Sequence, residues 1–193
     1  MTAPQLVVLA GPNGAGKSTF YDAFLAESPL PFLNADLFAA ETGVDSAEAA
    51  RILDATRDRM IADRLGFITE TVFSDPYGAK LAMMRTAVEA NYDVTLVYIG
   101  IATVDLSAKR IDQRVASGGH DVPRDRLAPR FERSLANLKE AVSFVPSVEI
   151  YDNSSVDEPY QRIASFRAGS LAFRASKIPR WARDIVPRER RAR

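Results

Sequence analysis

Gly11-Pro-Asn-Gly-Ala-Gly-Lys-Ser18 is the segment from which the rest of the chain can be interpreted. It matches G-x-x-x-x-G-K-[ST], the pattern of a phosphate-binding P-loop. Glycines permit backbone conformations in which successive N–H groups turn toward an anion, and the helix that follows points its N-terminus at the same anion. We therefore expect ATP to be bound by Gly11, Pro12, Asn13, Gly14, Ala15, Gly16, Lys17, Ser18 and Thr19.

Two residues of this P-loop have separate chemical tasks. Lys17 brings a positive charge to the β- and γ-phosphates and is therefore a predicted catalytic residue. The hydroxyl of Ser18 is the predicted protein ligand of the Mg²⁺ that accompanies ATP. The preceding segment Gln5–Ala10 is continuously apolar, as in a strand that is buried on both faces, so the surroundings support the P-loop.

The composition limits the classes of protein that need to be considered. With 193 residues, the chain is expected to form one domain, residues 1–193. The net charge is zero, which argues against a nucleic-acid partner, and no apolar run is long enough to span a membrane. The chain contains no cysteine and one histidine, which excludes thiol chemistry and fits a cytoplasmic location.

Strands and helices alternate along most of the chain. This alternation predicts a three-layer α/β fold with a parallel five-stranded core sheet. The last part, about 160–193, differs: it predicts a β-hairpin followed by a basic tail. The hairpin is expected either to add antiparallel strands at an edge of the sheet or to form a small flap. The five core strands are expected at residues 5–10, 31–36, 67–72, 93–100 and 148–152.

Three polar residues follow predicted strands and are candidates for the acceptor side of the site. Asp36 ends the second predicted strand, and Glu70 and Thr71 lie at the end of the third. Parallel α/β sheets bind ligands at the carboxyl ends of their strands, so these side chains should meet the P-loop. Asp36 is the predicted catalytic base; the alternative is a turn or helix-cap role. Glu70 and Thr71 are predicted substrate contacts; for Glu70 the alternative is a solvent-facing strand residue.

Four arginines flank a glycine pair and predict a hinged lid over about residues 104–130. Phosphoryl transfer requires positive charge around the migrating group, so Arg114 and Arg130 are predicted catalytic residues. His120 follows the glycine pair and is either a substrate contact or a turn residue with local hydrogen bonds. The full set of lid arginines is Arg110, Arg114, Arg130 and Arg133.

The C-terminal segment is strongly basic. From Lys177 to Arg193 there are seven basic and two acidic residues. A solvated, frayed terminus and a phosphate-binding tail both fit this pattern.

Together, these segments resemble the zeta-toxin-like family of P-loop kinases. The resemblance extends from about Leu6 to Ser154. It implies a nucleoside-monophosphate-kinase-like sheet, with ATP–Mg²⁺ as phosphoryl donor, UDP-N-acetylglucosamine as acceptor, and an antitoxin protein as a partner. It also implies that Asp36 is the base, that Glu70 faces the sugar and that the lid arginines face the phosphates. The matching segments are Gly11-Pro-Asn-Gly-Ala-Gly-Lys-Ser-Thr19, Asn34-Ala-Asp36, Glu70-Thr71, Arg114 to Arg130 with Gly118-Gly-His-Asp-Val-Pro123, and Tyr151-Asp-Asn-Ser154.

The sequence-based hypothesis is therefore an ATP-dependent kinase that acts on the hydroxyl of a small molecule such as a sugar nucleotide. One alternative is a kinase of another metabolite or of polynucleotide 5′-hydroxyls. A second alternative is a nucleotide-dependent switch or binding protein without kinase activity. The chain has no N-K-x-D segment for guanine, which weakens a GTPase interpretation.

Overall fold

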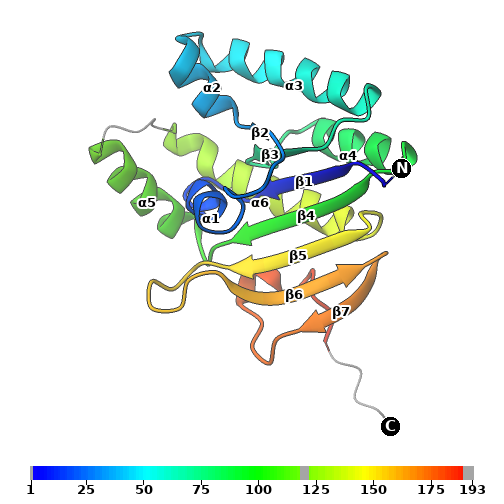
Figure 1. Cartoon of the computed structure of the whole chain (residues 1–193). Helices are drawn as coiled ribbons and strands as arrows, with labels where there is room; N and C mark the ends of the chain where they lie inside the picture. Colours follow the sequence, from blue (N-terminus) through cyan, green and yellow to red (C-terminus); the bar gives the residue numbers. More distant parts are fainter. Residues whose placement is uncertain (1, 118–121, 189–193) are drawn as a thin grey trace.

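The computed structural model describes residues 2–117 and 122–188, and its centre is one mixed sheet (Figure 1). The strands are hydrogen-bonded in the order β2-β3-β1-β4-β5-β6-β7. Strands β1 to β5 are mutually parallel, whereas β6 runs antiparallel to β5 and β7 antiparallel to β6. Their bounds are β1 Gln5–Ala10, β2 Phe32–Leu33, β3 Phe67–Thr71, β4 Asp93–Gly100, β5 Ser147–Asp152, β6 Gln161–Arg167 and β7 Ser170–Arg174.

Helices connect the parallel strands and lie on both sides of the sheet. In Figure 1, α1 lies in front of the sheet and α6 behind it, while α2 and α3 lie beyond its β2 edge. A short 3₁₀ helix, η1 (Arg180–Ala182), follows the last strand. The helices are α1 Lys17–Phe24, α2 Ala35–Thr42, α3 Ser46–Ala62, α4 Ala79–Glu89, α5 Val104–Ala116 and α6 Arg124–Ala141.

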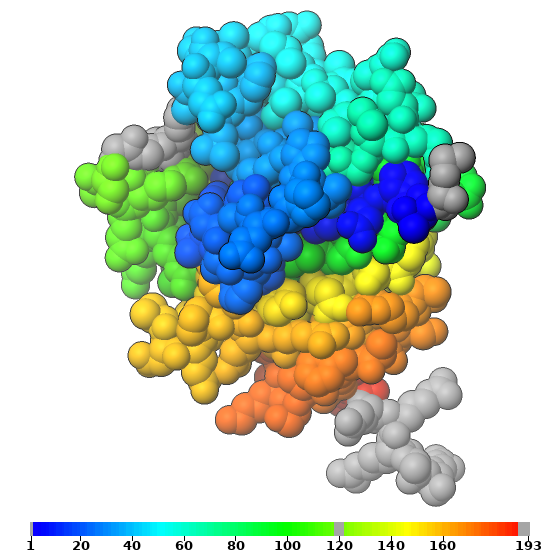
Figure 2. All heavy atoms as spheres, viewed as in Figure 1, coloured from blue at the N-terminus to red at the C-terminus, as the bar shows by residue number. Residues whose placement is uncertain are grey.

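The prediction of a five-stranded parallel sheet has to be corrected. The predicted hairpin, β6 and β7, continues the same sheet by pairing with β5, so the sheet has seven strands and is mixed. A hairpin needs only a short turn, here Ala168 and Gly169, which both have positive φ angles. Figure 2 shows the hairpin as the orange surface below α1, so it extends the sheet past this helix.

The side chains of β1 alternate between the two faces of the sheet, which explains why helices cover both faces. Leu6, Val8 and Ala10 belong to the larger core, which contains residues of α4, α6 and the C-terminal segment. Leu9 points to the other side and packs in a smaller cluster with Phe20 of α1. Burial on both faces is the expected environment of a continuously apolar parallel strand, so the interpretation of Gln5–Ala10 is confirmed.

A membrane-spanning helix is absent from the described parts of the chain: none of their helices is both long and apolar enough.

Candidate active site

The P-loop joins β1 to α1 and forms one wall of a cavity of about 440 Å³. Gly16 caps α1 with φ 89°, a left-handed conformation that favours glycine. The predicted nucleotide-binding residues Asn13, Gly14 and Gly16 to Thr19 line this cavity, hereafter the nucleotide cavity, whereas Gly11, Pro12 and Ala15 do not. The remaining lining residues are Asp36, Glu70, Val72, Arg110, Gln113, Arg114, Asn153 and Tyr160.

Helix α5 holds the first half of the P-loop. The hydroxyl of Ser107 donates to the carbonyl oxygen of Asn13 at 2.7 Å, and Arg110 Nη1 donates to that of Gly14 at 3.3 Å. Arg110 therefore supports the loop backbone as well as lining the nucleotide cavity.

The segment after β5 holds the second half of the P-loop. Asn153 Nδ2 donates to the carbonyl oxygen of Ala15 at 2.9 Å, and the Tyr160 hydroxyl donates to that of Gly16 at 2.9 Å. A trans peptide unit points its carbonyl and its N–H in opposite directions. Holding these two carbonyls therefore aims the N–H groups of Gly16 and Lys17 away from Asn153 and Tyr160, as binding of an anion requires.

Lys17, Ser18 and Asn34 all contact the carboxylate of Glu70. Lys17 Nζ lies 3.6 Å from Glu70 Oε1, while Ser18 Oγ and Asn34 Nδ2 donate to Glu70 Oε2 at 3.1 and 2.9 Å. Burial of Lys17 lowers the pKa of its amine, and the negative charges of Glu70 and then Asp36 oppose that shift. The predicted phosphate-binding lysine and the predicted Mg²⁺ ligand thus share one carboxylate.

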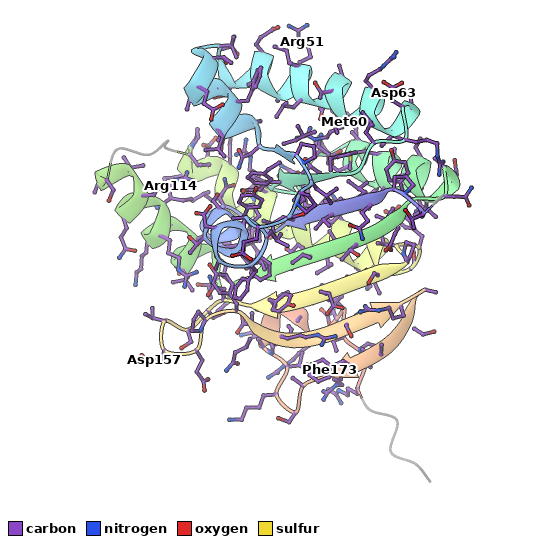
Figure 3. The ribbon with its side chains drawn as sticks, in the orientation of Figure 1. Arg51, Met60, Asp63, Arg114, Asp157 and Phe173 are labelled. Carbon is purple, nitrogen blue, oxygen red and sulfur yellow. The ribbon has the colours of Figure 1, made fainter. Side chains whose placement is uncertain are left out.

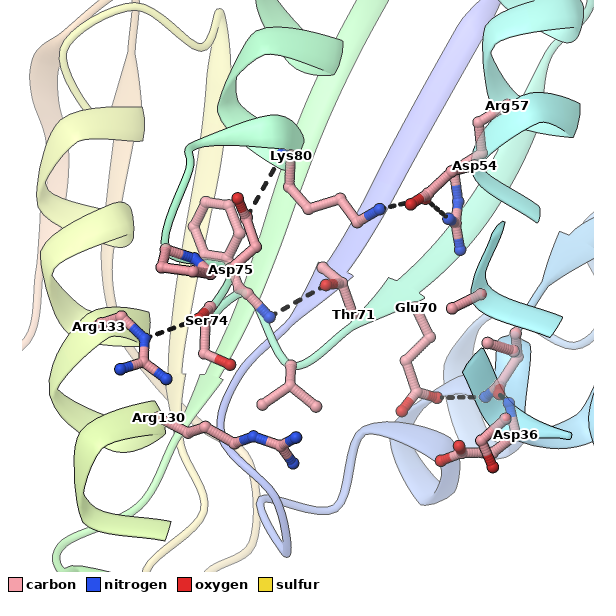
Figure 4. Close-up of a pocket in the computed structure, with 17 residues that line it drawn as sticks. Asp36, Asp54, Arg57, Glu70, Thr71, Ser74, Asp75, Lys80, Arg130 and Arg133 are labelled. Atoms are coloured by element: carbon pink, nitrogen blue, oxygen red, sulfur yellow. Dashed lines mark hydrogen bonds and ion pairs between the residues drawn. The ribbon is translucent and has the colours of Figure 1, made fainter. Parts of the chain in front are cut away.

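A second cavity of about 450 Å³ adjoins the first (Figure 4). We call it the acceptor cavity. Asp36, Glu70 and Val72 line both cavities and so form their common wall. The other residues that line the acceptor cavity are Asn34, Ala35, Ser46, Ala50, Asp54, Arg57, Thr71, Phe73, Ser74, Asp75, Pro76, Lys80, Arg130 and Arg133.

Asp36 lies in the first turn of α2, which corrects its predicted position at a strand end. Strand β2 stops at Leu33, and Asn34 caps α2 by accepting hydrogen bonds from the N–H groups of Asp36 and Leu37 at 2.9 and 3.2 Å. The Asn side chain competes for backbone donors and so starts a helix where the pattern suggested a longer strand. Asp36 nevertheless lies between the two cavities.

The structure separates the predicted lid arginines. Arg114 on α5 lines the nucleotide cavity, whereas Arg130 on α6 lines the acceptor cavity (Figures 3 and 4). Arg133 also lines the acceptor cavity and donates from Nε to the carbonyl oxygen of Ser74 at 2.9 Å. The prediction for His120, like the glycine hinge, lies outside the described residues.

Several residues of the site were not predicted from the sequence as site residues. Asn34 is one: its Oδ1 caps α2 and its Nδ2 donates to Glu70. Arg57 is another: it is 3% exposed, donates to Thr69 Oγ1 at 2.7 Å and pairs with Asp54. An arginine on the apolar face of a helix is the signal that would have identified it. Asn153 and Tyr160 were missed because their contacts with the P-loop are long-range.

The described residues contain no group of three acidic or histidine side chains that would hold a metal ion by itself. Mg²⁺ is typically bound by one or two protein oxygens together with nucleotide phosphates. Ser18, with Glu70 at 3.1 Å and Asp36 in the same cavity, fits that mode.

Solved structures with the same fold are distantly related in sequence. The complex of AvrRxo1-ORF1 and -ORF2 with ATP has a TM-score of 0.67 and 17% identity over 88% of this chain. This match covers only 60% of that protein's length. The PezAT chromosomal toxin–antitoxin system of Streptococcus pneumoniae has a TM-score of 0.58 and 16% identity over 90% of this chain and 71% of its own. At these identities the likeness shows the fold, a P-loop kinase-like α/β fold.

Sequence comparison identifies the family. An uncharacterized protein of Haemophilus influenzae is 31% identical over 133 residues, which make up 66% of this chain and 92% of that protein. The family model AAA_33, described as an AAA domain, matches residues 6–139. The match includes the P-loop, the common wall of the two cavities and most of α6, and the chain therefore belongs to the AAA_33 family of AAA domains.

Proposed function

We propose that residues 1–193 form one ATP-dependent kinase domain, which transfers the γ-phosphoryl group of ATP to a hydroxyl of a small molecule. The observation that carries the proposal is the common wall, where Asp36 and Glu70 face both a P-loop cavity and a second polar cavity. A nucleotide-dependent switch needs only the first of these cavities. A kinase needs two, because the donor phosphate and the acceptor hydroxyl must meet.

In this proposal the nucleotide cavity binds Mg·ATP. The backbone N–H groups around Gly16 and the amine of Lys17 bind the phosphates, and Ser18 holds Mg²⁺. The ion supplies neutralisation of phosphate charge when bound. Arg114 adds positive charge from α5. Glu70, which contacts Lys17 and Ser18, also lines the acceptor cavity and faces the acceptor there.

Asp36 orients the acceptor hydroxyl for in-line attack. The hydroxyl oxygen forms a bond to the γ-phosphorus while the bond from that phosphorus to the β–γ bridging oxygen breaks, and ADP leaves. The hydroxyl proton passes to the carboxylate of Asp36. The transition state is loose, so the positioning of the hydroxyl contributes alongside proton removal.

The charge distribution in the acceptor cavity supports a sugar nucleotide, such as UDP-N-acetylglucosamine, as the acceptor. Figure 4 shows Arg130 and Arg133 extending from α6, opposite Asp36 and Glu70. Among the described residues, the side chain of Arg130 has no hydrogen-bond or ion-pair partner. A molecule with a hydroxyl at one end and phosphates at the other matches both sides, since arginine binds phosphate oxygens in a bidentate manner.

A protein partner is part of the same proposal. Both structural neighbours described above are complexes with a second protein, AvrRxo1-ORF2 in one and an antitoxin in the other. An antitoxin-like partner of this chain would act by covering the adjoining cavities.

The experiment is a screen for acceptor-stimulated release of ADP from Mg·ATP. The panel contains sugar nucleotides, the corresponding free sugars and nucleosides, and Lys17→Ala is the control because it removes the charge beside the transferred phosphate. We expect ADP release that depends on one class of acceptor and is abolished in Lys17→Ala. Hydrolysis of ATP that no acceptor stimulates would favour the switch, and wild-type turnover in Lys17→Ala would refute the P-loop assignment.

A further inference from the structure

The C-terminal segment is connected to the P-loop by a chain of buried and part-buried contacts. Trp181, in η1, is 9% exposed and lies against Gly100 at the end of β4. A Cβ on Gly100 would lie 2.2 Å from the indole, so only glycine lets the ring approach this closely. The indole Nε1 donates to Asp152 Oδ1 at 2.9 Å, and Ser154 Oγ donates to the same oxygen at 2.5 Å.

Asp152 contacts the C-terminal segment, whereas the next residue, Asn153, contacts the P-loop. Asp152 accepts the indole hydrogen bond, whereas Asn153 is 7% exposed and donates from Nδ2 to the P-loop carbonyl of Ala15. The backbone N–H of Asn153 also donates to the carbonyl oxygen of Gly100 at 2.8 Å. Asn153 is therefore held by its own backbone hydrogen bond to Gly100 of β4 and, through its neighbour Asp152, by the indole hydrogen bond of the C-terminal segment.

Tyr160 belongs to the same network of hydrogen bonds. Its N–H donates to Asn153 Oδ1 at 3.4 Å, and its hydroxyl donates to the carbonyl oxygen of Gly16. A Cβ on Gly16 would lie 2.6 Å from Asn153 Nδ2 and 2.8 Å from the Tyr160 hydroxyl, so the loop and these side chains are in close contact. The supporting side chains, those of Asp152, Asn153, Tyr160 and Trp181, all lie beyond residue 139, where the match to the family model ends.

We infer that Trp181 and Asp152 are positioning residues for nucleotide binding. They act through Asn153, which holds the carbonyl of Ala15 and thereby aims the N–H of Gly16 at the phosphates. The C-terminal segment is then part of the nucleotide site rather than an addition to the fold. This inference rests on the proposed function, because it assumes that the P-loop binds a nucleotide.

The chain provides its own reporter, because Trp181 is its only tryptophan. We expect the fluorescence of Trp181 to change when Mg·ADP is titrated into the native protein, with a midpoint equal to the dissociation constant from calorimetry. A fluorescence signal that does not change while calorimetry detects binding would contradict the inference. If calorimetry detects no binding of Mg·ADP by the native protein, the proposed function itself fails.

Substitutions separate positioning from packing. Asp152→Ala removes the acceptor of the indole hydrogen bond, and we expect Mg·ADP to bind about tenfold more weakly. Asp152→Asn keeps an oxygen that accepts from the indole, so its affinity should return to within about twofold of the native value. Trp181→Phe keeps a ring against Gly100 but loses the N–H, so it should weaken binding as Asp152→Ala does.

Asp184→Ala is the matched control, since it removes an exposed carboxylate from the same segment without touching the P-loop contacts. Its affinity for Mg·ADP should equal the native value. The inference is overturned if Asp152→Ala and Trp181→Phe bind Mg·ADP with native affinity. It is also overturned if Asp152→Asn is as weak as Asp152→Ala, because the loss would then not depend on the hydrogen bond. Thermal unfolding of each variant verifies that it is folded at the assay temperature.

Discussion

At the scale of single residues, Glu70 lies on the wall that the two cavities share. Its carboxylate accepts hydrogen bonds from Ser18 and Asn34 and lies 3.6 Å from the amine of Lys17. Its neighbour Thr69 takes part in a different network, with Arg57. Adjacent residues of β3 thus contribute to the nucleotide cavity on one side and support α3 on the other, because side chains alternate along a strand.

Asp36→Asn tests the proposed base. The substitution preserves the shape of the side chain but removes its charge and basicity, and we expect turnover to fall by about 10²–10⁴. The affinity for Mg·ATP should change little, because the P-loop carries most of that binding. If excess Mg²⁺ restores turnover, Asp36 acts on the metal rather than on the hydroxyl. Full activity would exclude Asp36 from the site.

At the scale of elements, α2 places Asp36 and begins at Asn34. Asn34 has two tasks: its Oδ1 caps the helix, and its Nδ2 donates to Glu70. Two substitutions separate these tasks, because aspartate is as good a cap as asparagine but lacks the amide donor.

Asn34→Ala removes both the cap and the donor, and we expect a loss of about 1 kcal/mol in the free energy of unfolding together with reduced turnover. Asn34→Asp keeps the cap but places a second carboxylate against Glu70. It should reduce turnover too, because the new negative charge repels the carboxylate of Glu70. Urea unfolding and acceptor-dependent ADP release measure the two effects. Equal turnover in Asn34→Asp and the native protein would show that the contact with Glu70 is dispensable.

The helices α5 and α6 present their arginines to different cavities, which gives a second prediction at this scale. Lysine retains the charge of arginine but loses its planar fork. Arg114→Lys should raise the KM for ATP more than that for the acceptor, whereas Arg130→Lys should do the reverse. Steady-state kinetics with both substrates varied tests this separation. The same change of both KM values in each variant would mean that the two arginines act on one shared group, as originally predicted for the lid.

At the scale of the whole molecule, the larger core joins strands, α4, α6 and the C-terminal segment. Tyr98 of β4 is fully buried in it, and its hydroxyl lies 2.9 Å from Ser134 Oγ on α6. Burial raises the pKa of Tyr98 above its ordinary value of 10.0. The core therefore contains a phenol whose neutral form is favoured by the folded state.

Stability should accordingly fall as the pH rises above 10. The unfolded chain releases the Tyr98 proton there while the folded chain retains it, so the free energy of unfolding decreases by up to about 1.4 kcal/mol per pH unit. Tyr98→Phe removes this contribution and should reduce the slope, at a cost of about 1 kcal/mol below pH 9 for the lost hydrogen bond. Urea unfolding at pH 8, 10 and 11 measures both. Equal slopes in the two proteins would show that Tyr98 ionises without unfolding.

The sequence by itself determined the P-loop, the strand before it and the α/β alternation. These features are local: a buried strand, a glycine-rich turn and a helix start are each encoded by residues that are neighbours in the chain. The candidate residues Lys17, Ser18 and Glu70 followed from the same logic, since parallel strands end at one edge of the sheet.

Only the tertiary structure decided how the site is divided and supported. The sheet gained two further strands because the hairpin pairs with β5. Asp36 lies in a helix because Asn34 caps it, and Arg130 faces the acceptor side because α6 packs behind the sheet. The contacts of Asn153 and Tyr160 with the P-loop join residues more than a hundred positions apart. Such contacts depend on the packing of whole elements, which no local pattern of residue types records.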